Sequence, residues 1–436
     1  MRSFALLVLL AGCRPARPSL SATEVYERLS PSIAHLSMGL SGGSGVLLDG
    51  RLVLTNAHVV WPHEKTRVTF APDLEFIDVP VKAIDIDADL ALVGPLPDSL
   101  DRKPLTIVSP EGLPIGSEVF LIGYPGEIEK FPQPAITRGV LSRVREARFE
   151  NLTFLQSDAT IVGGQSGGAL VSSRGDIIGI SGLIGIEQFA LVLSGADVLA
   201  RMPGISESPS PLARSTTASK VNTTQPFSFD ATHRQAAWLF QANEGDQVRL
   251  TLDGAALAVF DSDLSAVEEP AGDSFRIDVS GPQFVVATQA DARSGTLESD
   301  HFLTAFTDPD DGQAIRIGTD LHGVIDFPTD EDRYVLPLEA GQQVSVRVDG
   351  VLDALCSVFD ESGAQELAAA RVAEGGLGMA AELRFEAPRT GRFVVAVGES
   401  SPEGPAGYEL RVSLADRGTG RRRTAPTDAG VLRNRR

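Results

Sequence analysis

A serine lies between glycines in the stretch Gly163-Gly164-Gln165-Ser166-Gly167-Gly168. The glycines predict a tight turn on which backbone N–H groups converge, and their small size lets another molecule approach closely. A nucleophilic hydroxyl that attacks a carbonyl needs such donors nearby, because they stabilise the negative oxygen that develops. Glycine-rich turns are also common in loops without any catalytic role, so the stretch alone leaves a structural turn as the alternative.

A histidine follows an apolar run upstream of this turn, in Leu54-Thr55-Asn56-Ala57-His58-Val59-Val60. A serine hydroxyl is inert near neutral pH unless a base takes its proton, and imidazole has a suitable pKa for that task. A single histidine is more often structural. We expect that structural role for His35 and His63, and we expect His63, between Pro62 and Glu64, to lie in an exposed turn.

Three acids compete for a third role in the stretch Asp85-Ile86-Asp87-Ala88-Asp89-Leu90-Ala91. A carboxylate that enters a buried strand is costly unless it is paired. A carboxylate that holds an imidazole in the correct tautomer is paired in this way, with the imidazole as its partner. Asp89 lies directly against the apolar run and is therefore the preferred partner of His58, whereas Asp85 and Asp87 are expected in a solvated turn.

The order His58, Asp89, Ser166 is the order of the chymotrypsin family. Residues 30–203 resemble a trypsin-like protease of the bacterial Deg/HtrA type. Gln165 stands where Deg proteases usually have Asn, and we expect activity to survive because glutamine is also polar. The resemblance rests on Thr55–Val60, Asp89–Ala91, Gly123–Pro125, Thr137–Ser142, Gln156–Ile161 and Phe189–Ser194.

The resemblance implies a serine endopeptidase that uses His58, Asp89 and Ser166, with protein or peptide substrates. It implies an oxyanion hole at the N–H groups of Gly164 and Ser166. It also implies a substrate pocket that contains no acid, which favours small or medium aliphatic side chains, at Ile161, Ile180, Ser181 and Gly182. The alternative is a catalytically inactive envelope protein of this fold, whose additional domains bind protein or glycan.

The short strands predict an all-β protein, and the resemblance implies a chymotrypsin-like double β-barrel, which two β-sandwich domains are expected to follow. Short β-type runs fill residues 22–203, which we assign to the protease domain, with helices expected at Ala22–Leu29 and Ser194–Met202. Residues 204–222 have the Ser, Thr and Pro composition of a linker. Two related copies of a β domain follow, at 223–308 and 319–415.

The copies share alternating runs, such as Gln247–Leu252 with Gln343–Val348 and Phe284–Ala287 with Phe393–Ala396. The second copy resembles the bacterial pre-peptidase C-terminal domain, through Asp330–Tyr334, Gly391–Val395 and Tyr408–Leu410. Calcium at Asp330, Glu331 and Asp332 is one interpretation of the acidic stretch. A solvated acidic turn without a metal is the interpretation that we prefer, and no other cofactor is expected.

Residues 1–13 resemble a bacterial lipoprotein signal that ends at a lipidated Cys13. Residues 14–21 would then be a tether, and the protein would be exported to the cell envelope, in the periplasm, on a membrane or at the cell surface. The alternatives are a plain secretory signal and a misassigned start. Residues 416–436 are expected to form a basic disordered tail.

The composition is that of an ordinary globular protein, with 42% hydrophobic and 22% charged residues. A net charge of −20 disfavours nucleic acid as a partner. The second cysteine, Cys356, lies in an apolar run and is expected to be a small core residue rather than a nucleophile. With Cys13 acylated, no disulfide is expected. The oligomeric state is left open.

Overall fold

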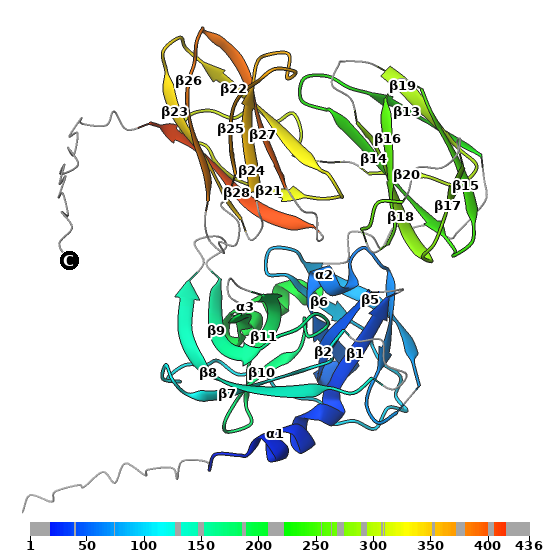
Figure 1. Ribbon diagram of the computed structural model, residues 1–436, viewed down its shortest axis with the longest axis vertical. Helices are drawn as coiled ribbons and strands as arrows, with labels where there is room; N and C mark the ends of the chain where they lie inside the picture. Colours follow the sequence, from blue (N-terminus) through cyan, green and yellow to red (C-terminus); the bar gives the residue numbers. More distant parts are fainter. Residues whose placement is uncertain are drawn as a thin grey trace, which may run out of the picture.

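The structure is a computed structural model with two β-barrels and two β-sandwiches among its described residues (Figure 1). The strong β patterning of the sequence and this architecture agree, so the predicted fold class is confirmed. The described residues are 18–38, 41–73, 75–126, 132–146, 152–184, 189–207, 222–253, 255–262, 264–267, 274–288, 294–306, 308, 310–350, 354–371, 380–399 and 405–415.

The first barrel closes in the order β1-β2-β3-β6-β5-β4, and the second in the order β10-β11-β12-β9-β8-β7. The strands of the first are β1 Ile33–Met38, β2 Ser41–Leu48, β3 Leu52–Thr55, β4 Lys65–Thr69, β5 Ile77–Asp85 and β6 Leu90–Val93. Those of the second are β7 Glu118–Gly123, β8 Ala135–Glu146, β9 Thr153–Thr160, β10 Ala169–Ser172, β11 Ile177–Ile184 and β12 Phe189–Ser194.

Three α-helices accompany the barrels in the described part of the chain. Helix α1, Ala22–Leu29, begins at a capping box in which Ser21 and Glu24 bond each other's backbone N–H groups. Helix α2, Ala57–Val60, is a single turn after β3, and short 3-10 turns lie at Ser30–Ser32 and Asp49–Arg51. Helix α3, Gly195–Glu207, continues past Pro203, where the sequence predicted its end. Burial of Ile205 in the core shared by the barrels stabilises that last turn.

The first sandwich pairs two four-stranded sheets, β13-β19-β15-β17 and β16-β18-β14-β20. Its strands in the first sheet are β13 Thr223–Ser228, β19 Ser294–Ser299, β15 Gln247–Leu252 and β17 Ser274–Arg276. Those in the second sheet are β16 Ala256–Phe260, β18 Gly281–Thr288, β14 Gln235–Ala242 and β20 Thr304–Ala305.

The second sandwich pairs the sheets β21-β28-β23-β26 and β22-β27-β24-β25. Strands β18 and β27 each lie between two partners, as expected from their matching sequence runs. Its strands are β21 Asp320–Ile325, β28 Ala406–Leu414, β23 Gln343–Gly350, β26 Ala381–Glu386, β22 Glu331–Leu338, β27 Gly391–Glu399, β24 Ala354–Phe359 and β25 Glu366–Arg371. The resemblance of this domain to the pre-peptidase C-terminal domain stays a prediction.

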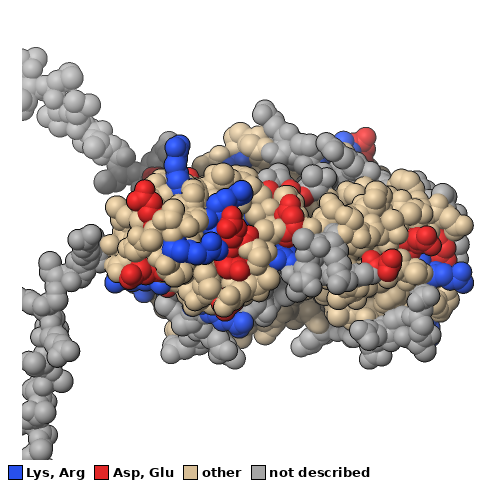
Figure 2. Space-filling view, turned by 90° about the horizontal axis from the view of Figure 1, so that it is seen from above, with Lys and Arg blue, Asp and Glu red and all other residues tan. Residues whose placement is uncertain are grey.

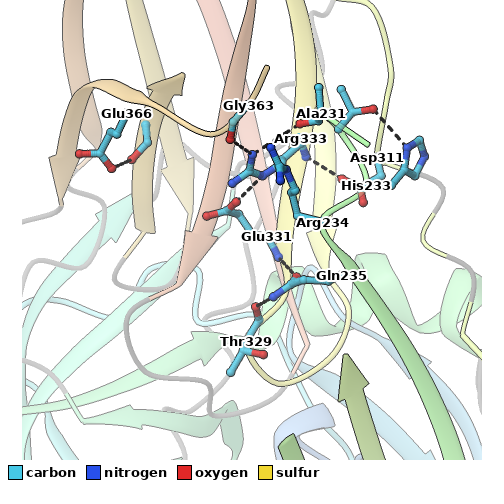
Figure 3. A network of polar contacts seen from close by, with 12 residues as sticks. Ala231, His233, Arg234, Gln235, Asp311, Thr329, Glu331, Arg333, Gly363 and Glu366 are labelled. Atoms are coloured by element: carbon cyan, nitrogen blue, oxygen red, sulfur yellow. Dashed lines mark hydrogen bonds and ion pairs between the residues drawn. The ribbon is translucent and has the colours of Figure 1, made fainter. Parts of the chain in front are cut away.

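The sandwiches pack against the first barrel and against each other. The ring of Trp61, directly after α2, stacks on Phe284 of the first sandwich, with their centroids 5.2 Å apart. His322 of the second sandwich bonds Asp87 of the barrel at 2.7 Å. Between the sandwiches, the Arg333 guanidinium of the second lies against the Ala231 carbonyl of the first, and the Glu331 N–H donates to Gln235 Oε1 at 3.0 Å (Figure 3).

Cys356 is fully buried in the core of the second sandwich, and this burial raises the pKa of its thiol to about 12. The signal at 1–13, the first half of the tether at 14–21, most of the linker at 204–222 and the tail at 416–436 lie outside the described residues. Within the described part, no helix has the length and apolar character needed to cross a membrane.

Candidate active site

Ser166 lies on the turn between β9 and β10, in the second barrel. Gly164 and Gly167 on either side adopt φ angles of +84° and +81°, which side chains rarely tolerate. A Cβ at Gly167 would lie 2.0 Å from the carbonyl oxygen of Ser44, so the turn also requires glycine for close packing. The turn is therefore held tightly against β2 of the first barrel.

Gln165, the position that departs from the Deg pattern, is buried inside this turn. Its Oε1 accepts a hydrogen bond from the backbone N–H of Val162 at 2.9 Å, and its own N–H donates to the carbonyl of Val162. Its carbonyl oxygen accepts from the Ser181 hydroxyl at 2.5 Å. The glutamine thus closes the loop that precedes Ser166. The sequence had indicated only that a polar residue is tolerated at this position.

His58 lies on α2 and is held by Asp89, which directly precedes β6. Asp89 Oδ2 lies 2.7 Å from Nδ1 of the His58 ring, and Asp89 Oδ1 accepts from the His58 backbone N–H at 3.0 Å. One carboxylate therefore fixes both the ring and the backbone of the histidine. The two side chains are 32% and 26% exposed, so the pair faces a solvent-accessible surface.

Asn56 contributes to this arrangement, and the sequence analysis did not assign it a role. Its buried side-chain amide donates to the carbonyl of Asp89 at 2.8 Å, which steadies the backbone of a residue with a φ of +50°. Its position two residues before His58, at the end of β3, was the available signal. The same amide lies 2.9 Å from where a Cβ of Gly182 would be, so Gly182 leaves room for it.

The loops that carry His58 and Ser166 meet at two glycines. A Cβ at Gly43 would lie 2.5 Å from Val59, the neighbour of His58, and 3.2 Å from the Ser166 carbonyl oxygen. The Ser166 hydroxyl donates to the carbonyl of Gly182 at 3.4 Å. The loops that carry His58 and Ser166 therefore meet at the junction of the two barrels, where the Ser166 hydroxyl is directed at Gly182.

The backbone donors predicted for the oxyanion hole are available in this conformation. Within the described residues, the backbone N–H groups of Gly164 and Ser166 have no hydrogen-bond acceptor. The Gly163 carbonyl accepts from the N–H of Gly126 at 2.6 Å. Because the C=O and N–H of a trans peptide point in opposite directions, the Gly164 N–H points away from Gly126. The turn can thus donate two N–H groups to a negative oxygen.

The residues predicted to form the substrate pocket lie beside this turn, at different depths. Ile180 and Ser181 are fully buried, and Ile180 packs in the core shared by the barrels. The Ser181 backbone bonds the serine turn in both directions, to Gly167 and Gly168. Ile180 and Ser181 therefore support the turn from behind, whereas Gly182 contacts the Ser166 hydroxyl directly.

The sequence predicted Asp85 and Asp87 in a solvated turn, but the structure pairs both acids with other residues. Arg201 of α3 bonds Asp85 at 3.3 Å, and His322 of the second sandwich bonds Asp87 at 2.7 Å. The side chains are 14% and 28% exposed. The prediction was wrong because both partners come from segments far along the chain, whose packing the local pattern does not reveal.

The fold and site define a chymotrypsin-like serine protease domain. The model of the trypsin-like peptidase domain family matches residues 43–180. "Serine protease HTR4" of Rattus norvegicus is 33% identical over 178 residues, which cover 36% of this chain and 35% of that protein. "Serine protease HTRA1A" of Danio rerio is 31% identical over 179 residues, which cover 37% and 36%. Residues 43–180 therefore match a trypsin-like peptidase domain, and the two relatives to which this part of the chain is similar are HtrA serine proteases.

The chain spans about a third of the length of these curated relatives. A solved structure described as "HtrA-type protease AlgW with tripeptide" is also similar, with 27% sequence identity and a TM-score of 0.39. The similarity covers 43% of this chain and 64% of that one.

Proposed function

We propose that the protein is a serine endopeptidase that cleaves protein substrates outside the cytoplasm through an acyl-enzyme. The observation that carries this proposal is the Asp89–His58 contact of 2.7 Å beside a serine turn with two available N–H donors. Ser166 Oγ attacks the scissile carbonyl while His58 accepts its proton through Nε2. Asp89 keeps the His58 proton on Nδ1 and stabilises the imidazolium that forms.

The second half of the reaction uses the same groups. The N–H groups of Gly164 and Ser166 bind the oxyanion of each tetrahedral intermediate. His58 returns its proton to the leaving amine, which departs and leaves an ester on Ser166. Water then attacks the ester, with His58 again as the base, and releases the second product.

The deciding experiment is labelling of the full chain with a fluorophosphonate probe, followed by peptide mapping. The probe should modify Ser166, and Ser166→Ala should lose the label and reduce casein hydrolysis by about a millionfold. Ser142→Ala, at a partly exposed serine on β8, is the matched control and should be labelled normally. A folded wild-type protein that takes up no label would favour the inactive binding protein instead.

Substrate preference follows from the residues around the turn. Ile161, Ile180, Ser181 and Gly182 include no acid that could pair with a substrate Lys or Arg. We therefore expect small or medium aliphatic side chains before the cleaved bond. Profiling with a peptide library tests this expectation, and cleavage mainly after Arg would contradict it.

The proposed location depends on the N-terminal sequence. The apolar stretch Phe4–Leu10, followed by Cys13, supports export and a lipid anchor at that cysteine. Several acyl chains on one protein give stable membrane attachment. Mass spectrometry of the mature N-terminus should find acylated Cys13, and Cys13→Ala should release the protein from membranes. An unmodified N-terminus at another residue would refute the anchor.

A further inference from the structure

Three aspartates meet where the segment that joins the sandwiches crosses the second sandwich. Side-chain oxygens of Asp308, Asp310 and Asp332 all lie within 4.8 Å of one another, and these residues are called the aspartate cluster. Asp308 and Asp310 follow β20, the last strand of the first sandwich, whereas Asp332 is the second residue of β22. The cluster therefore connects the joining segment to a strand of the second domain.

The cluster differs from the calcium ligands considered from the sequence, which were Asp330, Glu331 and Asp332. Glu331 pairs with Arg333, on the face of β22 opposite Asp332, because successive residues of a strand point to opposite sides. The preferred interpretation, a solvated acidic turn, is also wrong, since Asp330 and Asp332 are 3% and 0% exposed. The segment before β21 covers them, and its contact with β22 cannot be read from the local pattern.

Two oxygens in the aspartate cluster are buried without a hydrogen-bond partner. These are Oδ1 of Asp332 and Oδ2 of Asp308. The other oxygens are occupied: Asp332 Oδ2 accepts from the Tyr408 hydroxyl, and Asp308 Oδ1 accepts from the Asp310 N–H at 2.7 Å. Asp310 accepts from the N–H of Val324 at 3.0 Å. The carboxylates are thus held in place with two acceptor atoms unsatisfied, an arrangement that buried polar groups normally avoid.

Positive charge from the protein reaches the aspartate cluster only weakly in the described residues, through the charge interaction of the His322 ring with Asp310. Among the ion pairs of the described residues, none joins a Lys, Arg or His to Asp308, Asp310 or Asp332. Burial, together with the charges of Asp308 and Asp310, raises the pKa of nearby Asp326 to about 7. Buried charges of one sign require a counter-charge.

The face of the sandwiches drawn in Figure 2 does not show such a concentration of acid. On the face of the sandwiches drawn in Figure 2, the described acidic and basic side chains are interspersed over a largely uncharged surface. The aspartate cluster offers only carboxylate oxygens, which are ligands for hard cations such as Ca²⁺ and not for the softer metals that prefer nitrogen or sulfur.

We propose that Asp308, Asp310 and Asp332 bind a calcium ion, which fastens the joining segment to β22 of the second sandwich. The unsatisfied oxygens of Asp308 and Asp332 are the ligands that the ion gains, and water completes the coordination. The contacts of Arg333 with Ala231 and of Glu331 with Gln235 join the two sandwiches close by (Figure 3). The calcium ion therefore adds to an existing rigid connection between the sandwiches.

The test uses the full chain after removal of metals with EDTA, and it does not depend on the peptidase. Calcium chloride should produce saturable heat in a calorimetric titration. It should also raise the melting temperature of the second sandwich by roughly 10 °C at a concentration about a hundredfold above Kd. No heat and no shift would overturn the proposal, and a Mg²⁺ response at least as strong would overturn the assignment to calcium.

Variants separate the ion from a purely structural role of the acids. Asp308→Asn should abolish the calcium response, while its metal-free form should melt no lower than the metal-free wild type, because a repelling charge has been removed. Asp332→Asn should also lose the response. Asp320→Asn changes an exposed acid of the same domain that pairs with Arg411, and it should keep the full response. An unchanged calcium response in Asp308→Asn would overturn the proposal.

Discussion

Replacing Asp89 by asparagine tests how the catalytic groups depend on one carboxylate. In the Asp89→Asn variant, the side-chain oxygen can still accept the His58 backbone N–H, as Asp89 Oδ1 does at 3.0 Å. The amide nitrogen of the variant would then face Nδ1 of the ring, where the carboxylate oxygen now lies at 2.7 Å. An amide N–H donates to an unprotonated Nδ1, which moves the ring proton to Nε2. His58 can then no longer accept the proton of Ser166.

Two magnitudes distinguish this effect from unfolding. In a protease with this constellation, the wrong tautomer lowers kcat about ten-thousandfold, which corresponds to about 5.4 kcal/mol of transition-state stabilisation. The side chains of the pair are 32% and 26% exposed. An ion pair with such access to water contributes about 1 kcal/mol or less to folding. Activity should therefore collapse while the protein stays folded.

The assay compares the rate of fluorophosphonate labelling and of casein hydrolysis with the urea midpoint of unfolding. Asp87→Asn is the matched control, because that acid lies two residues away and bonds His322 instead of His58. The control should keep nearly full activity. Labelling of Asp89→Asn within tenfold of the wild-type rate would refute the role of Asp89 in orienting His58.

Three further predictions concern stability and reactivity. Trp61→Ala should lower the free energy of unfolding by about 3 to 5 kcal/mol in urea titrations, because the buried ring stacks on Phe284; a loss below about 1 kcal/mol would contradict this. Burial lowers the pKa of His35 below 6.5, so the unfolded chain takes up the proton first and stability falls as the pH drops through and below 6.5. His35→Phe should lose less stability between pH 7.5 and 5, and an equal loss would count against the assignment. Cys356, with its pKa raised to about 12, should resist a thiol reagent at pH 8 until guanidinium unfolds the protein, as peptide mapping can check.

The parts of the fold that repeat a local pattern could be predicted from the sequence. Helix α1 occupies Ala22–Leu29, the range that the sequence predicted before Pro31. Strands such as β26 alternate buried and exposed residues, and this alternation is visible in the sequence. The His58, Asp89 and Ser166 stretches were recognisable because each catalytic role demands a particular residue type next to a strand end.

The errors of prediction fall where distant segments meet. His63 was expected in an exposed turn, yet it is buried, and a Cβ on Gly281 of the first sandwich would lie 3.3 Å from its ring. The aspartate cluster combines Asp332 with two residues more than twenty positions earlier in the chain. Composition and periodicity describe the face that a strand buries, but not the domain that covers it.

The same long-range packing places both sandwiches next to the catalytic loops. Trp61, three residues after His58, is covered by Phe284 of the first sandwich, and Asp87, two residues before Asp89, is bonded by His322 of the second. The first sandwich thus contacts the helix that carries the base, and the second contacts the loop that carries its partner. Both sandwiches therefore pack against segments that flank the catalytic pair, while the Asp89–His58 contact itself lies within the first barrel.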